Sequence, residues 1–152
     1  MKNVLLLVLL FTSINAIAQV NTINKPPKKT WKIFIKNSNS KEANYKLIGQ
    51  TIINNDFSIE KKDAEYLTTE TTPKVTEGET SIFYLKFIAK DNLIILTGEA
   101  KSRINANFAG AYEEYSKIKN VGMNGSIAKD QFNSMLNFAK LFLNSEFEFI
   151  AE

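Results

Sequence analysis

The chain has 152 residues, of which 19 are lysine or arginine and 16 are aspartate or glutamate, and it contains neither histidine nor cysteine. The formal net charge of +3 is too small to indicate a nucleic-acid partner or an anionic membrane surface. The missing histidine and cysteine exclude a Ser-His-Asp triad, a thiol nucleophile, a His or Cys metal site and a disulfide. No arrangement of the remaining polar residues indicates a reaction, so we expect no enzyme activity, no metal and no cofactor.

The first 18 residues have the pattern of a secretory signal peptide. Lys2 precedes an apolar run from Val4 to Phe11, and Ala16-Ile17-Ala18 then offers small residues for cleavage. That run is far too short to span a bilayer. The next residue is Gln19, so the acylated cysteine of exported bacterial lipoproteins is missing. We therefore expect cleavage near Ala18 and a soluble exported chain, periplasmic or secreted, without a stable membrane anchor.

The chain that remains after such cleavage is long enough for one domain. Residues 19–30 combine two prolines with lysines and polar residues, a composition that predicts an extended linker. We therefore expect a single folded domain over residues 31–152.

The first strand and the first helix are predicted from hydrophobic periodicity. Residues 31–36 alternate, with Trp31, Ile33 and Ile35 on the side expected to face the core. Residues 41–54 then predict a helix, because their larger apolar side chains and one threonine share a broad arc at helical period. That arc contains Tyr45, Leu47, Ile48, Thr51 and Ile52.

Two shorter strands are expected next. Residues 57–61 start the second strand, and the threonine-rich residues 66–72 should return as the third. Pro73 should end that strand, because proline cannot donate a hydrogen bond to a neighbouring strand. We expect a loop at residues 75–79.

The clearest pattern is a hairpin formed by residues 81–89 and 93–104 around a turn at Asp91-Asn92. Centring the turn there determines which residues pair. One face then holds pairs that can interdigitate as a core requires: Ala89/Ile94, Phe87/Leu96, Leu85/Gly98 and Phe83/Ala100. The other face holds Ile88/Ile95, Lys86/Thr97, Tyr84/Glu99 and Ile82/Lys101. Because this second face is half polar, we expect it to be open to solvent or to a partner.

The last third of the chain predicts one more helix. Residues 105–110 resemble a loop, and residues 112–119 fit either a short strand or a helix. Ser126 is a credible N-cap for a helix over residues 127–144. The apolar face of that helix would contain Phe132, Met135, Leu136, Ala139, Phe142 and Leu143. The tail at residues 147–150 alternates weakly and predicts a cap on the core or a short edge strand.

The order of these elements indicates the fold class. Runs of adjacent antiparallel strands with only two helices are typical of an α+β fold. We expect a two-layer sandwich in which an antiparallel sheet of four to five strands carries both helices on one face.

The layout resembles a known kind of exported domain. The segment from Ala43 to Thr71 runs as a helix, then Asn55-Asp56-Phe57-Ser58-Ile59-Glu60, then a threonine-rich strand, and Gly125-Ser126 precedes a helix with Phe132, Met135, Leu136 and Ala139. Over about residues 31–145 this resembles small exported bacterial domains of unknown function with a helix–four-strand–helix core, like that of TATA-binding-protein-like folds. It is also similar to the domains of the lipoprotein subunit of the outer-membrane β-barrel assembly machine, whose lipoprotein cysteine is missing here. The resemblance implies a protein-contact module without catalytic residues.

The half-polar sheet face provides the candidate site. Phe34 falls on this face if its neighbours in the first strand point inward. With Tyr84, Lys86, Thr97, Glu99 and Lys101 it would form an amphipathic platform of the kind that binds partners. The sequence therefore favours an exported, non-catalytic interaction module that contacts an envelope or extracellular protein. The alternative is a carrier of an apolar small molecule, with a cavity between the sheet and the helices among the many phenylalanine side chains.

Overall fold

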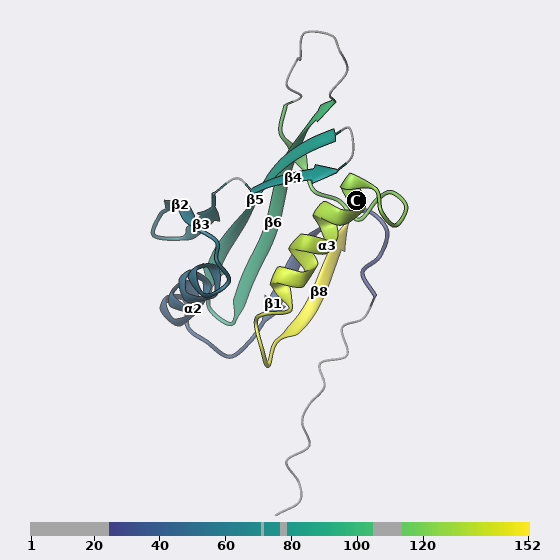
Figure 1. Ribbon diagram of the computed structural model, residues 1–152. Helices are drawn as coiled ribbons and strands as arrows, with labels where there is room; N and C mark the ends of the chain where they lie inside the picture. The colour runs from purple at the N-terminus through teal and green to yellow at the C-terminus, as the bar shows by residue number, and fades with distance from the viewer. Residues whose placement is uncertain (1–24, 71, 77–78, 105–113) are drawn as a thin grey trace, which may run out of the picture.

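The computed structural model describes residues 25–70, 72–76, 79–104 and 114–152 (Figure 1). In chain order the elements are β1 (Thr30–Lys36), α2 (Lys41–Asn54), β2 (Ile59–Lys62), β3 (Tyr66–Thr69), β4 (Thr72–Thr76), β5 (Glu79–Lys90), β6 (Leu93–Ile104), β7 (Ser116–Lys117), α3 (Ile127–Ala139) and β8 (Glu146–Ala151). The predicted signal peptide and the predicted loop at residues 105–110 lie outside the described residues. Among those described, no helix has the length and the apolar character to cross a membrane.

The strands form one antiparallel sheet built around the long β5–β6 hairpin. Its main order is β2-β3-β5-β6-β1-β8, while β4 pairs with β5 and β7 pairs with β6 (Figure 1). Both helices contribute to the same core, so the predicted two-layer α+β sandwich is confirmed. The sheet has eight strands rather than four to five. The additional strands are β4, β7 and β8. Of these, β7 and β8 take the strand alternatives left open for residues 112–119 and 147–150, while β4 has no counterpart in the prediction.

The hairpin has the predicted register. Pairs run from Ile82↔Lys101 to Lys90↔Leu93, and the turn residue Asn92 adopts a positive φ of 58°. The face predicted to be apolar is almost completely buried. Its residues Phe83, Leu85, Phe87, Ala89, Ile94, Leu96 and Ala100 are each at most 4% exposed.

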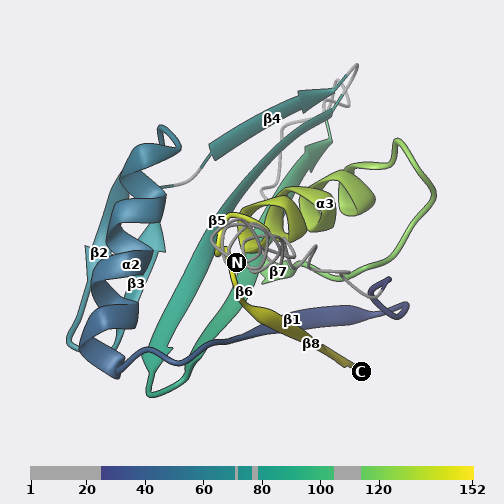
Figure 2. The same cartoon turned by 90° about the horizontal axis from the view of Figure 1, so that it is seen from below.

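The two helices cover this buried face from opposite ends. Helix α2 packs on β3 and β5, and α3 packs on β6 and β1 (Figure 2). Phenylalanine rings fill the space between them: Phe138 contacts Phe57, Phe87 and Phe142, with ring centroids 5.3, 5.1 and 6.4 Å apart. The helices and the hairpin therefore bury their apolar residues in one common cluster.

The helix boundaries follow their caps. Ser40 and Ser126 accept hydrogen bonds from the backbone N–H groups of Ala43 and Lys129, as N-cap residues do. Helix α2 has its predicted bounds. Helix α3 ends at Ala139 instead of residue 144, because the chain leaves the helix through a turn in which Asn144 has a φ of 57°. Beyond the helix end, Leu143 no longer belongs to the apolar face and is 78% exposed.

The loop predicted at residues 75–79 is wrong for its first part, because β4 continues through Thr76. Pro73 stands opposite Ile82 in this strand. Among the described strands β4 pairs with β5 alone, so its other edge makes no strand pairing. Proline is tolerated in such an edge strand, because no neighbouring strand needs a hydrogen bond from its nitrogen. The prediction that Pro73 ends the third strand is therefore wrong: β3 stops at Thr69, and Pro73 lies inside β4.

The segment before β1 is attached to the domain. The side-chain amide of Asn120 donates hydrogen bonds to the carbonyl oxygens of Pro26 and Pro27, at 3.0 and 2.7 Å. The backbone N–H of Lys29 donates to the carbonyl of Asn120, and Thr30 is completely buried. Residues 26–30, within the segment that the sequence assigns to a linker, are therefore bonded to the domain.

Candidate functional site

The candidate site is the sheet face opposite the helices, which we call the open face. It carries the side chains that alternate with the buried ones on β5, β6 and β1, together with their neighbours on β3 and β7. The six residues predicted from the sequence all lie on it and are all half-buried: Phe34, Tyr84, Lys86, Thr97, Glu99 and Lys101. The three central strands thus place the predicted residues on one surface.

Tyr84 is held on the open face by two side-chain contacts. Its Oη donates a hydrogen bond to Glu99 Oε2 on the neighbouring strand, at 2.5 Å. Its ring also meets the edge of Tyr115, with centroids 5.4 Å apart and planes at 69°. Burial raises the pKa of Tyr84 above its ordinary value, and the hydrogen bond to the Glu99 carboxylate raises it further. Tyr84 is therefore a neutral, oriented side chain at the centre of the open face.

Lysine amino groups lie over aromatic rings across the same face. Lys86 Nζ is 4.8 Å from the ring centroid of Tyr66, and Lys101 Nζ is 4.8 Å from that of Tyr115. An exposed cation–π contact of this kind contributes about 0.5–1 kcal/mol. The contacts restrict lysine side chains that would otherwise be free to rotate. The open face therefore presents charges in defined positions.

Trp31 belongs to this surface, which corrects its predicted inward orientation. Lys117 Nζ and Lys32 Nζ lie 4.1 and 4.3 Å from its ring centroid, and the register places both lysines on the open face. The pairing of β1 with β8 shifts register between Thr30 and Lys32, and Thr30 takes the buried position. This irregularity breaks the alternation, so Ile33 and Ile35 are buried while Trp31 is half-buried on the other side.

A hollow of about 310 Å³ lies on the open face beside Tyr84. Its lining combines three tyrosines with charged and polar groups: Glu60, Lys61, Tyr66, Thr68, Tyr84, Lys86 and Tyr115. Sequence reasoning missed Tyr66 and Tyr115 as site residues, because they join the site only through the pairing of β3 and β7 with the hairpin. The hollow is polar and suits a side chain with hydrogen-bonding groups better than an apolar molecule.

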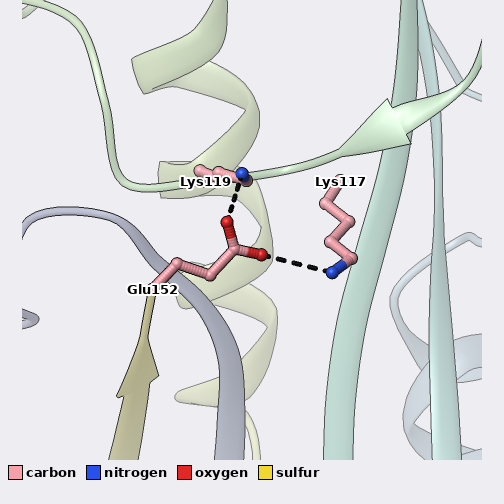
Figure 3. Close-up of polar contacts among 3 residues, drawn as sticks. All are labelled: Lys117, Lys119 and Glu152. Atoms are coloured by element: carbon pink, nitrogen blue, oxygen red, sulfur yellow. Dashed lines mark hydrogen bonds and ion pairs between the residues drawn. The ribbon is translucent and has the colours of Figure 1, made fainter.

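A second polar cluster lies at the end of β8 (Figure 3). The Glu152 carboxylate bridges two lysines, with 2.6 Å from Oε2 to Lys119 Nζ and 3.2 Å from Oε1 to Lys117 Nζ. The hydrogen bond from Lys119, and to a smaller extent that from Lys117, holds the pKa of Glu152 below its ordinary value. Because Lys117 also lies over Trp31, this cluster connects the open face to the end of β8.

The described side chains of the open face supply aromatic, cationic and hydrogen-bonding groups. In the part of the chain that the structure describes, no group of three or more acidic side chains is arranged to hold a metal ion. Every buried polar side-chain atom described has a hydrogen-bond partner. What the face offers is ring surfaces, lysine ammonium groups and a hydrogen-bonded tyrosine–glutamate pair.

Comparisons with family models, with curated proteins and with solved structures found no match to this chain. The resemblance to exported bacterial contact domains therefore stays a prediction.

Proposed function

We propose that this chain is an exported, non-catalytic interaction module that contacts a protein of the bacterial cell envelope or exterior through its open face. The observation that carries this proposal is the arrangement of half-exposed tyrosine, tryptophan and lysine side chains on one sheet face. Tyrosine and tryptophan are enriched at protein interfaces, because each provides a large contact area with few rotatable bonds.

The restraint of these side chains supports the same proposal. Binding costs free energy when side chains must be ordered, about 0.5–1.5 kcal/mol for each rotamer-rich group. On the open face Tyr84 is already hydrogen-bonded, and Lys86 already lies over Tyr66. The side chains that a partner would contact have therefore lost part of their rotational freedom before binding.

Export is supported by the sequence of residues 1–18. The proposal predicts that the chain recovered outside the cytoplasm begins at Gln19. Mass spectrometry of the protein from periplasmic and culture fractions would test this. An intact Met1 in those fractions, or recovery from the cytoplasm alone, would contradict export by this signal.

The carrier of an apolar small molecule is less well supported. It requires a cavity between the sheet and the helices, where the rings of Phe87, Phe138 and Phe142 contact one another. Closely packed rings in this position favour a filled core.

Partner capture tests the proposal. The bait would be the purified chain, the variants Tyr84→Ala and Lys86→Glu, and Lys46→Glu as a control. Lys46 is exposed on α2 in the helical layer, so its reversal makes the same charge change away from the open face. Circular dichroism would verify that all four are folded.

We expect chemical cross-linking in an envelope extract, followed by quantitative mass spectrometry, to identify a protein held by wild type and by Lys46→Glu. Tyr84→Ala and Lys86→Glu should lose it. Equal recovery by all four proteins would show that the open face is not the contact surface.

A further inference from the structure

Charge is unevenly distributed over the open face. Among the described residues, the central strands and β7 place Lys32, Lys86, Lys101 and Lys117 on this face, against one carboxylate, that of Glu99. That carboxylate already accepts the hydrogen bond from Tyr84. Toward the two edges of the sheet the signs are mixed, with Glu60 beside Lys61 on β2 and Glu148 paired with Lys36 at 2.7 Å. The centre is therefore cationic, whereas both borders contain carboxylates.

Two of the central lysines form no ion pair with any described residue. Among the described residues, no carboxylate lies within ion-pair distance of Lys32 or Lys86, whose amino groups rest over the rings of Trp31 and Tyr66. Both side chains are half-buried. A half-buried ammonium group has lost part of its hydration, so a carboxylate brought by a partner would gain more there than at a fully exposed lysine.

From this distribution we infer that the partner presents carboxylates to the centre of the open face and is an acidic polypeptide; this inference rests on the proposed function. Complementary charge of this kind gives specificity and speeds association. A polyanion long enough to cross the whole face fits less well, because it would meet Glu60 on β2 and Glu146 and Glu148 on β8, whereas a short acidic segment contacts the centre alone. A second copy of the chain through the same face would oppose lysine to lysine.

Trp31 provides a built-in reporter, because it is the only tryptophan in the sequence. The amino groups of Lys32 and Lys117 both lie within 4.3 Å of its ring centroid. Carboxylates that bind these lysines would change the surroundings of the ring. The tryptophan fluorescence of the full chain should therefore change, saturably, when an acidic peptide binds.

The probe would be a short, fluorescein-labelled poly-L-glutamate peptide at low salt. We expect saturable binding by fluorescence anisotropy, a matching change in Trp31 emission, and weakening as salt is raised. The double variant Lys32→Glu/Lys86→Glu should bind at least roughly tenfold more weakly. Lys46→Glu should stay within about twofold of wild type, because its charge lies in the helical layer.

Poly-L-lysine and a single-stranded oligonucleotide of similar length separate the possible sources of binding. We expect no binding of poly-L-lysine and weaker binding of the oligonucleotide. Equal or tighter binding of the oligonucleotide would overturn the acidic polypeptide in favour of a general polyanion site. The acidic polypeptide would also be overturned if Lys46→Glu weakened the binding of polyglutamate as much as the double variant does. No binding of polyglutamate, while capture of the envelope protein still depends on Lys86, would overturn the acidic partner and leave the interaction module intact.

Discussion

The two faces of the β5–β6 hairpin are made by alternate residues of the same two strands, yet they differ in almost every property. On one face Phe83, Leu85 and Phe87 are at most 4% exposed and packed under both helices. On the other, Tyr84 and Lys86 are half-exposed and make polar and cation–π contacts. A shift of one residue along the strand therefore separates side chains that stabilise the domain from side chains available to a partner. Substitutions on the two faces should have separable effects.

The largest expected effect comes from Phe87→Ala on the buried face. Phe87 is completely buried and its ring contacts Phe138 and Phe142, so truncation leaves a cavity among the phenylalanine rings. We expect the free energy of unfolding to fall by about 3–5 kcal/mol. Denaturation by urea would measure it. The matched control is Ile88→Ala, the next residue on the open face, which should cost less than half as much; equal losses would mean that the two faces are not energetically distinct.

Gly98→Ala should have the next largest effect. A Cβ atom built at Gly98 would lie 2.7 Å from Ile118 Cδ1 and 3.1 Å from Leu85 Cδ2, both in buried side chains. The neighbours would have to repack, so we expect a loss of about 1–3 kcal/mol in the free energy of unfolding. Gly49→Ala on α2 is the control, because nothing lies within 4 Å of its added Cβ.

That control should act in the opposite direction. Alanine in a helix interior is favoured over glycine by about 0.8–1 kcal/mol, so Gly49→Ala should stabilise the domain. Thermal unfolding would show whether Gly98→Ala lowers and Gly49→Ala raises the stability of the domain. Stabilisation by Gly98→Ala would show that Ile118 does not pack tightly against the hairpin.

Much of the fold could be predicted because its strongest signals are local. The turn at Asp91-Asn92 and the alternation on either side determine the hairpin register, and Ser126 marks the start of α3. The strand β4 could not be found in this way, since it contains Pro73, and β7, with only two residues, left residues 112–119 open between a short strand and a helix. Each exists because the long hairpin offers it a free edge, which is a property of the assembled sheet.

The part of the candidate site that lies on the hairpin could be predicted from the sequence, and the rest could not. Tyr84, Lys86, Glu99 and Lys101 follow from the hairpin register. Tyr66 and Tyr115 could not be placed, because they reach the open face only through pairing between strands distant in the sequence. The alternation of residues 31–36 predicts the wrong face for Trp31, since the irregularity between Thr30 and Lys32 leaves no trace in that pattern.

Tyr84→Phe would sharpen the comparison by changing a hydrogen bond on the open face without changing shape. The hydrogen bond to Glu99 is partly exposed, so its loss should cost about 0.5–1.5 kcal/mol. Because the pKa of Tyr84 is raised in the folded state, its contribution to stability is fully present below the unfolded pKa of about 10 and is lost as the pH rises above it. Wild type should therefore lose more stability than the variant between pH 9 and about pH 11. Parallel alkaline profiles would mean that the phenol is not desolvated at the sheet surface.

The smallest expected effect is that of Glu152→Gln at the end of β8. Its ion pairs with Lys117 and Lys119 lie among side chains that are 35–49% exposed, and exposed pairs contribute little because water and salt screen them. The pKa of Glu152 is lowered, so its contribution is present above the unfolded pKa of about 4.5 and is lost as the pH falls through the lower folded value. The difference between wild type and variant should therefore be small at pH 7 and vanish in acid. Glu148→Gln, which breaks the exposed pair with Lys36, is the matched control and should behave alike. The free energy of unfolding could instead fall nearly as much with Glu152→Gln as with Gly98→Ala. In that case the carboxylate would hold β8 against the segment after β7, and the border of the open face would stabilise the domain as the buried face does.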